Sequence, residues 1–395
     1  MKRIAAMLVI ICASAICAAQ EMTPDLDHPW TDGRYSTITE PFCTGGVKPK
    51  SAKWLKLNVK GMKSSVWTRA VIQNHPAPLV VILNGTFGHA ADPEANLLMA
   101  WLEEKGYHAF TFDSTFLPAM NEASRHGVAG NLAAEAELSA RIIQTFLQHR
   151  EMAGKVTQIG VAGMSYGGTQ ALLLAKMSAA GKLPFRLDAV QAYSPPADVA
   201  SSMRILDDSF TYEWKLSDHY WKFSNLPRAY PMREQYDPKM MSAALGRVFR
   251  MGLQEVTERN DRLYGAELDK AGATRLMPRD AERDERLNYA EVVSFSQYFN
   301  NIAAPYWKAR GQNDLLEDGN LKELLKCCGA NVEVIIASND PLNEQGAVEE
   351  LQRMDFGKKL TVLPCGGHLG YINAKWTRSR LCNMFPGHSD VVANK

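Results

Sequence analysis

The sequence predicts an α/β fold with a mainly parallel sheet, and three observations lead to this prediction. Short apolar segments of strand length alternate with amphipathic segments of helix length along much of the chain. The segment 79–83 is apolar without interruption, as in a strand that is covered on both faces. The stretch from Asp340 to His368 has room for one helix and one strand, which is what two adjacent parallel strands require.

The predicted elements follow from local patterns in chain order. Two segments with strand alternation come first, and after Pro76 and Pro78 the strands become more apolar. Asp92 fits a helix N-cap with Pro93 at the first helical position. The predicted strands are 54–59, 66–72, 79–83, 109–112, 158–162, 189–193, 332–337 and 360–363. The predicted helices are 92–106, 131–150, 166–178, 344–354 and 371–382.

The α/β alternation is interrupted at about 200–305, which predicts an insertion. This stretch has no clear strand and is rich in Arg, Glu, Asp and Met, with a run at 279–286 that fits a solvated helix face. Its aromatic cluster at 210–236 is interpreted as the core of a cap, or as a partial lining of an acyl pocket. The predicted organisation is a signal peptide at 1–19, an N-terminal extension at 20–50, a core at 51–199 and 306–395, and a helical cap insertion at 200–305.

The first 19 residues have the pattern of a secretory signal. Lys2 and Arg3 precede the apolar run 4–16, and small residues follow it just before Gln20. A retained membrane anchor is the alternative, although the apolar run is short for one. No later segment is apolar over the roughly 18 residues that a membrane span needs. We therefore expect export to the periplasm or the exterior, and no transmembrane span in the mature chain.

The composition is that of a folded protein with a sizeable core. Of the 395 residues, 46% are hydrophobic, and 44 Lys and Arg balance 43 Asp and Glu. Disorder requires fewer apolar residues and more net charge, and a protein that reads nucleic-acid phosphates is normally more basic. We therefore expect neither disorder nor a nucleic-acid partner.

The cysteines beyond the signal are too few to build a disulfide scaffold, and no pair of them has the Cys-x-x-Cys spacing of a zinc or redox site. Cys327 and Cys328 precede their predicted strand, whereas Cys365 follows its own, so they are expected at opposite edges of the sheet. The closing helix brings Cys382 back toward the first pair. Any bridge in this region is therefore predicted to join Cys382 to Cys327 or Cys328.

Candidate chemistry begins at Gly163-Met164-Ser165-Tyr166-Gly167-Gly168, directly after a predicted strand and directly before a helix. In a nucleophile elbow, this sharp turn lifts the serine hydroxyl above the sheet. The residues two before and two after the serine must be tiny so that the backbones can pass. The Gly-x-Ser-x-Gly string alone is a weak signal, and its strand–turn–helix context makes it a strong one.

Two further loops follow predicted parallel strands. Asp340 lies in Ser338-Asn339-Asp340-Pro341, and His368 lies in Gly366-Gly367-His368-Leu369-Gly370. Parallel strands end at one edge of a sheet, where α/β active sites form. Ser165, Asp340 and His368 are therefore expected at the same edge, in the order Ser, Asp, His.

These motifs resemble those of the α/β-hydrolases over about 50–200 and 305–385, most closely esterase- and lipase-type members. The resemblance implies a serine hydrolase whose nucleophile is Ser165, whose base is His368 and whose acid is Asp340. The matching residues are Gly163, Ser165, Gly167, Gly168, Asp340, Pro341, Gly366, Gly367, His368 and Gly370.

The sequence departs from the family after the third strand, where a His-Gly dipeptide is usual and Asn84-Gly85-Thr86-Phe87-Gly88-His89 stands instead. The remaining glycine still allows the backbone to turn toward an oxyanion. The N–H of Tyr166 is one predicted oxyanion donor. The second is Thr86 or Phe87, of which we prefer Thr86.

Each assignment has a plainer alternative. Ser165 can be only a helix start, Asp340 can be only a helix cap with Asp314 as the rival acid, and His89 and Asp113 fit substrate-side or structural roles better than catalytic ones.

The predicted reaction is acyl transfer to water from a small-molecule or lipid ester. No P-loop, dinucleotide-binding or zinc-ligand spacing occurs in the sequence, so no cofactor or metal is expected. One alternative is a serine peptidase or amidase of the same fold, because Gly-x-Ser-Tyr-Gly-Gly also resembles the prolyl-oligopeptidase elbow. A non-catalytic binding protein on this fold is another.

Overall fold

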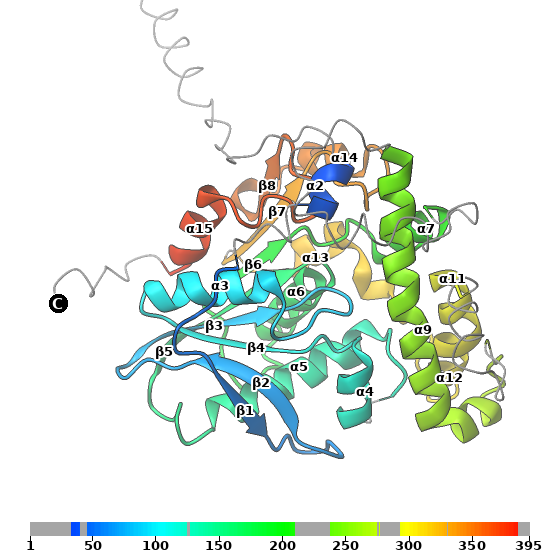
Figure 1. Cartoon of the computed structure of the whole chain (residues 1–395), viewed down its shortest axis with the longest axis horizontal. Coiled ribbons are helices and arrows are strands. Elements are labelled where there is room, and N and C mark those ends of the chain that lie inside the picture. Colours follow the sequence, from blue (N-terminus) through cyan, green and yellow to red (C-terminus); the bar gives the residue numbers. More distant parts are fainter. Residues whose placement is uncertain are drawn as a thin grey trace, which may run out of the picture.

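The computed structural model describes residues 33–39, 46–124, 127–209, 238–274, 276, 293–329 and 331–385. These residues form one eight-stranded sheet in the order β1-β2-β4-β3-β5-β6-β7-β8 (Figure 1). β1 and β2 pair antiparallel with each other, β2 pairs antiparallel with β4, and all further pairs are parallel. With helices on both faces, this is the predicted α/β-hydrolase fold.

The strands lie close to the predicted segments. Three of them, β6, β7 and β8, have the predicted bounds, and the others differ by one or two residues at one or both ends. β3 begins earlier than expected and includes Pro78, which lacks an N–H; the pairing of β3 with β5 shifts register between Ala77 and Leu79. The strands are β1 Lys53–Leu57, β2 Val66–Val71, β3 Ala77–Leu83, β4 His108–Phe112, β5 Val156–Met164, β6 Ala189–Tyr193, β7 Val332–Ala337 and β8 Leu360–Leu363.

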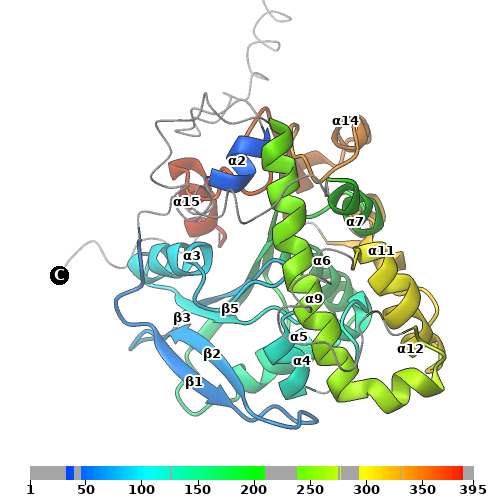
Figure 2. The ribbon, with the colours of Figure 1, turned by 45° about the vertical axis from the view of Figure 1, so that its right-hand side comes forward.

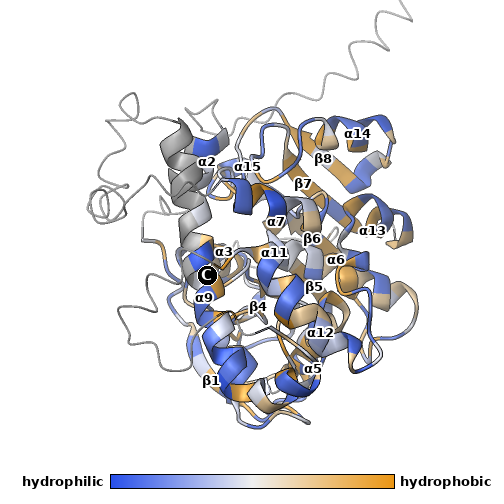
Figure 3. Cartoon of the chain, turned by 90° about the vertical axis from the view of Figure 1, so that its right-hand side faces the viewer, coloured by the Kyte–Doolittle hydropathy of each residue, from blue (hydrophilic) through white to orange (hydrophobic). Residues whose placement is uncertain are grey.

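Helices cover both faces of the sheet, each over its own apolar cluster. α3 and α15 pack on one face, and α5, α6, α13 and α14 pack on the other. In Figure 3 the central strands are coloured as hydrophobic, whereas the helices carry hydrophilic stretches. The helices are α3 Pro93–Glu104, α5 Leu132–Leu147, α6 Tyr166–Ala179, α13 Leu321–Cys327, α14 Ala347–Arg353 and α15 Lys375–Cys382.

The region predicted as a cap is mostly helical where the structure describes it. It contains α7 Val199–Asp208, α9 Pro238–Lys270, α11 Phe295–Tyr298, the π-helix η5 Phe299–Ala303 and the start of α12 Ala304–Lys308. α9 runs along one side of the molecule (Figure 1). The predicted aromatic cluster at 210–236 and the run at 279–286 lie outside the described residues, and the domain boundaries stay predictions.

A buried polar network ties α9 to the core. The amide of Asn121, in the short helix α4 Pro118–Ser124, donates to Asn260 of α9 at 2.6 Å. Asn260 donates to the hydroxyl of Tyr298 at 2.8 Å, and that hydroxyl donates to the carbonyl of Ala129 at 2.9 Å. Because buried polar groups are costly when unpaired, this network fixes α9 at one position on the core.

A short helix, α2 Gly33–Thr39, lies in the stretch predicted to be only an N-terminal extension. It sits beside the N-terminal half of α9, and the two views in Figures 1 and 2 agree on this. No periodic apolar pattern predicts a helix here, because the segment is only seven residues long and mostly polar.

The four described cysteines, Cys327, Cys328, Cys365 and Cys382, form no disulfide with one another. Cys328 packs in the cluster beneath α6, whereas Cys382 packs near α3 on the opposite face of the sheet. The predicted pairing considered only the edges of the sheet, and the two faces keep these thiols apart. Within the described ranges, no helix is long and apolar enough to cross a membrane.

Candidate functional site

Ser165 stands at a strained turn between β5 and α6. Its backbone has φ 54° and ψ −122°, a region that residues with a side chain rarely adopt. The Ser165 N–H donates to the carbonyl of Tyr193 in β6 at 2.8 Å. The turn is therefore anchored to the neighbouring strand, and the serine side chain projects at the carboxyl edge of the sheet.

The glycines around Ser165 are required by space. A Cβ on Gly163 would lie 2.1 Å from the carbonyl oxygen of Gly167, and a Cβ on Gly167 would lie 2.3 Å from that of Leu83. Real Cβ atoms do not approach backbone atoms so closely. The predicted reason for glycine at these two positions is confirmed by this packing.

The structure brings Ser165, His368 and Asp340 together. His368 Nε2 lies 2.7 Å from Ser165 Oγ, and His368 Nδ1 lies 2.9 Å from Asp340 Oδ2. The exposed fractions of the three residues are 8%, 6% and 5%, so bulk water competes little for these contacts. Asp340 Oδ1 accepts the N–H of Leu342 at 2.9 Å, which holds the carboxylate in place. This chain of contacts is the arrangement needed to withdraw a proton from a serine hydroxyl.

Three side chains hold the backbone around His368. The N–H of Gly367 donates to Asn339 Oδ1 at 2.9 Å, the N–H of His368 donates to Thr37 Oγ1 at 2.8 Å, and the N–H of Leu369 donates to Ser194 Oγ at 3.2 Å. Only Asn339 belongs to a predicted site motif. Thr37 and Ser194 were missed, and no local pattern in the sequence marks them.

The predicted oxyanion donors lie on both sides of Ser165. Tyr166 is the first residue of α6, so its N–H has no acceptor within the helix and lies at the positive end of the helix dipole. A Cβ on Gly85 would lie 3.3 Å from Cβ of Ser165, so the segment that contains Thr86 passes directly beside the serine. Phe87 has φ 61° and closes a turn in which the N–H of Gly88 donates to Gly85. The choice between Thr86 and Phe87 stays a prediction.

A buried carboxyl lies beneath the elbow. The side chain of Glu135 accepts the Tyr166 hydroxyl at 2.9 Å, the Thr115 hydroxyl at 2.5 Å and the Gly130 N–H at 2.6 Å. Burial raises the pKa of Glu135, and burial together with this carboxyl raises the pKa of Tyr166 well above its usual value. The network fixes the ring of the residue that follows Ser165.

The other candidate side chains lie elsewhere. Asp314, the rival acid, is exposed, and Asp340 occupies the position next to His368. His89 is exposed, with Nε2 3.5 Å from Asp113. Asp113 accepts the N–H of Ala90 at 2.9 Å, and burial raises its pKa. These contacts give His89 and Asp113 local structural partners.

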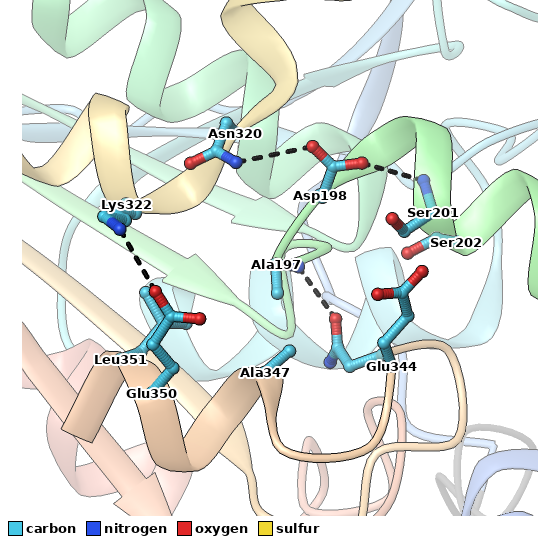
Figure 4. Close-up of a pocket in the computed structure, with 11 residues that line it drawn as sticks. Ala197, Asp198, Ser201, Ser202, Asn320, Lys322, Glu344, Ala347, Glu350 and Leu351 are labelled. Carbon is cyan, nitrogen blue, oxygen red and sulfur yellow. Dashed lines mark hydrogen bonds and ion pairs between the residues drawn. The ribbon is translucent and has the colours of Figure 1, made fainter. Parts of the chain in front are cut away.

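A surface pocket of about 330 Å³ lies beside the loop 338–346, which contains Asp340 and is called the acid loop below (Figure 4). The first turns of α7, α13 and α14 line it, and its polar groups pair with one another: Asp198 with Asn320, and Lys322 with Glu350. Asn343 Oδ1 accepts the N–H of Ala197 at 2.8 Å, which links the acid loop to the start of α7. Across the residues that the structure describes, no group of three or more His, Cys, Asp or Glu side chains is arranged to hold a metal ion.

Comparison with models of protein families finds no match, and comparison with curated protein sequences finds none. Among solved structures, an esterase of Pyrococcus furiosus is 12% identical, with a TM-score of 0.44, over 84% of this chain and 88% of the other. Carboxyl esterase 2 of the fungus Tuber melanosporum is 15% identical, with a TM-score of 0.43, over 94% of each chain. An acylaminoacyl peptidase of Pyrococcus horikoshii is 11% identical, with a TM-score of 0.43, over 84% of this chain and 41% of the other.

Proposed function

We propose that the chain is a serine hydrolase that cleaves ester-type bonds through an acyl-enzyme. The observation that carries the proposal is the pair of contacts of His368, with Ser165 Oγ at 2.7 Å and Asp340 Oδ2 at 2.9 Å. A buried histidine that bridges a carboxylate and a strained serine at the carboxyl edge of the sheet has few structural reasons to exist. The substrate class is a small-molecule or lipid ester.

The proposed reaction has two halves. His368 Nε2 accepts the hydroxyl proton of Ser165 while Oγ attacks the carbonyl carbon, and Asp340 stabilises the imidazolium and holds its orientation. The imidazolium then gives that proton to the leaving alcohol, and an acyl-serine remains. A water molecule, deprotonated by His368, attacks this acyl group and releases the acid and the free serine.

The N–H groups of Tyr166 and Thr86 are the proposed donors to the tetrahedral oxyanion. The position of Tyr166 at the start of α6 supports the first assignment, and the approach of Gly85 to Ser165 supports the second. Each such donor contributes about 2.7–4 kcal/mol to the stability of the transition state in serine hydrolases.

Ser165→Ala tests the proposal. We expect kcat on an activated ester to fall by about 10⁶-fold, because loss of the nucleophile removes the covalent route. A fluorophosphonate probe should label the native protein and not this variant. Labelling that persists in Ser165→Ala, or an unlabelled native protein without ester turnover, contradicts the proposal; the second result favours a binding protein on this fold.

A panel of esters beside a panel of peptides separates ester hydrolysis from the peptidase alternative. We expect kcat/KM to be higher for esters of matched acyl groups. Faster cleavage of peptide or anilide bonds would assign the site to a peptidase or amidase instead.

We also propose that the chain is exported with cleavage after Ala19, on the basis of the charged and apolar pattern of residues 1–19. These residues lie outside the described ranges. Sequencing the N-terminus of the protein recovered from its native compartment should begin at Gln20; an intact Met1 in a membrane fraction would contradict export with cleavage.

A further inference from the structure

The loop that carries His368 has a backbone conformation that its own residues do not strongly favour. Gly366 and Gly367 have φ values of 124° and 57°, and Leu369 has φ 66°. Three of four consecutive residues thus adopt positive φ, two of them glycines with a wide choice of alternative conformations. The position of His368 therefore depends on the groups that hold this loop from outside.

α2 supplies the group that holds His368 itself. Thr37 Oγ1 accepts the His368 N–H at 2.8 Å, and its own proton is donated to the carbonyl of Gly33 at 2.6 Å. The second bond orients the hydroxyl, so that a lone pair of Oγ1 faces the His368 amide. Thr37 is 6% exposed, so little water is available to replace it.

Close packing of backbone atoms determines the position of α2 on this loop. A Cβ on Gly367 would lie 2.1 Å from the carbonyl oxygen of Gly33, and a Cβ on Gly33 would lie 1.9 Å from that of Asn339. A Cβ on Gly370 would lie 2.7 Å from Cβ of Ser36. α2 therefore touches both the acid loop and the loop 364–370 that carries His368, called the base loop below, and only glycines fit at these contacts.

From these contacts we infer that α2 completes the hydrolytic site, with Thr37 as the positioning residue for His368. The inference rests on the proposed function. Asp340 orients the imidazole ring through Nδ1, and Thr37 fixes the backbone from which that ring extends. Together they set the distance from Nε2 to Ser165 Oγ. The stretch expected to be a mere extension is thereby part of the machinery that activates the serine.

The test compares Thr37→Val with Thr37→Ser. Valine keeps the shape of threonine and removes the acceptor, whereas serine keeps the acceptor. We expect Thr37→Val to lower kcat on an activated ester by about 10- to 100-fold with KM within about twofold, since small misplacements of a catalytic group have effects of this size. The rate of fluorophosphonate labelling of Ser165 should fall in parallel. Thr37→Ser should recover most of both rates.

Thr145→Val is the matched control. Thr145 also bonds the carbonyl four residues earlier in its helix, at 2.8 Å from Arg141, and it lies in α5 away from the base loop. Its substitution should leave kcat within about twofold. An equal loss of kcat in Thr37→Val and Thr145→Val would make the effect a general one of removing a helical hydroxyl, and would overturn the inference.

The outcomes separate the two proposals. A native protein that neither labels nor hydrolyses esters overturns both. A native protein that does so, with Thr37→Val equal to it in kcat and labelling rate, overturns the role of Thr37 alone. Should Thr37→Val fail to fold, amide hydrogen exchange of His368 in the native protein decides: slow exchange is expected, and exchange at the rate of an open loop would overturn the inference.

Discussion

The elbow at Ser165 and the loop at His368 meet at one edge of the sheet, yet they are held in opposite ways. The elbow is fixed by its own surroundings in the core: its strained backbone is confined by Gly163 at the end of β5, by Gly167 in the first turn of α6 and by the neighbouring strands. The base loop is fixed from outside, by side chains of Thr37, Asn339 and Ser194. The site thus combines a serine confined by backbone packing with a histidine whose backbone is held by side chains distant from it in sequence.

The largest effect is expected where the elbow is fixed by backbone packing. Gly167→Ala should lower the free energy of unfolding by about 3 kcal/mol or more and abolish activity, since the new Cβ would meet the Leu83 carbonyl at 2.3 Å. Denaturant unfolding and an ester assay measure both. The control is Gly168→Ala in the same helix, where the nearest atom would be Cβ of Pro195 at 3.2 Å. Equal stability of the two variants would contradict confinement by packing.

A substitution that removes a support of the base loop should lower kcat more clearly than it lowers the free energy of unfolding. Ser194→Ala removes the acceptor of the Leu369 N–H, and an unpaired buried donor costs about 1–3 kcal/mol. We expect kcat to fall by about tenfold while the fold persists. Ser178→Ala, which removes an acceptor of the Leu187 N–H at 3.3 Å far from the site, is the control. If both variants lose stability alike and neither loses kcat, the loop does not depend on outside support.

A smaller effect is expected at the ring beneath the elbow. Tyr166→Phe removes one bond to Glu135 but keeps the backbone N–H that is proposed to face the oxyanion. The free energy of unfolding should fall by about 1 kcal/mol, the usual net value of a hydrogen bond, and kcat by less than about fivefold. A loss of several hundredfold would show that the side chain, rather than the backbone, governs this donor.

The smallest effect concerns the pH dependence of stability. The elbow contacts an ionisable group, the Glu135 carboxyl, through Tyr166, whereas the base loop is held by the neutral side chains of Thr37, Asn339 and Ser194. Burial raises the pKa of Glu135, so above its ordinary pKa the folded state binds more protons than the unfolded state. The free energy of unfolding should therefore fall as pH rises from the ordinary pKa of a glutamate to the raised pKa of Glu135 in the folded state. In Glu135→Gln the fall should be shallower. Urea unfolding from pH 4.5 to pH 8 measures both slopes, and identical slopes would contradict the assignment.

The two regions also differ in how far the sequence predicts them. The elbow can be predicted from the sequence because its requirements are local: a turn of five residues needs glycines two positions before and two positions after Ser165. The eight strands were predicted for a similar reason, since apolar runs such as 332–337 have the length and pattern of covered strands. Asp340 and His368 could be expected at the same edge of the sheet because each follows one of these strands by a few residues.

The supports of the base loop could not be predicted in this way. Thr37 acts through a helix of seven residues, which is too short to show a periodic apolar pattern, and nothing near it in sequence refers to His368. Ser194 is one of several serines at strand ends and is distinguished only by its contacts with Leu369 and Tyr371. The sequence also did not show which face of the sheet each helix covers. The expected proximity of Cys382 and Cys328 was wrong for that reason, because they lie on opposite faces.

The bond between Thr37 and His368 has a consequence for the order of folding. It joins residues 331 positions apart, so it closes a loop that contains nearly the whole described chain. Closing so long a loop costs much chain entropy. We therefore expect this bond to form only after the strands between the two residues are assembled. On dilution from denaturant, the circular dichroism of the sheet should therefore recover first. Ester hydrolysis should follow after a lag, as the last property that the chain acquires.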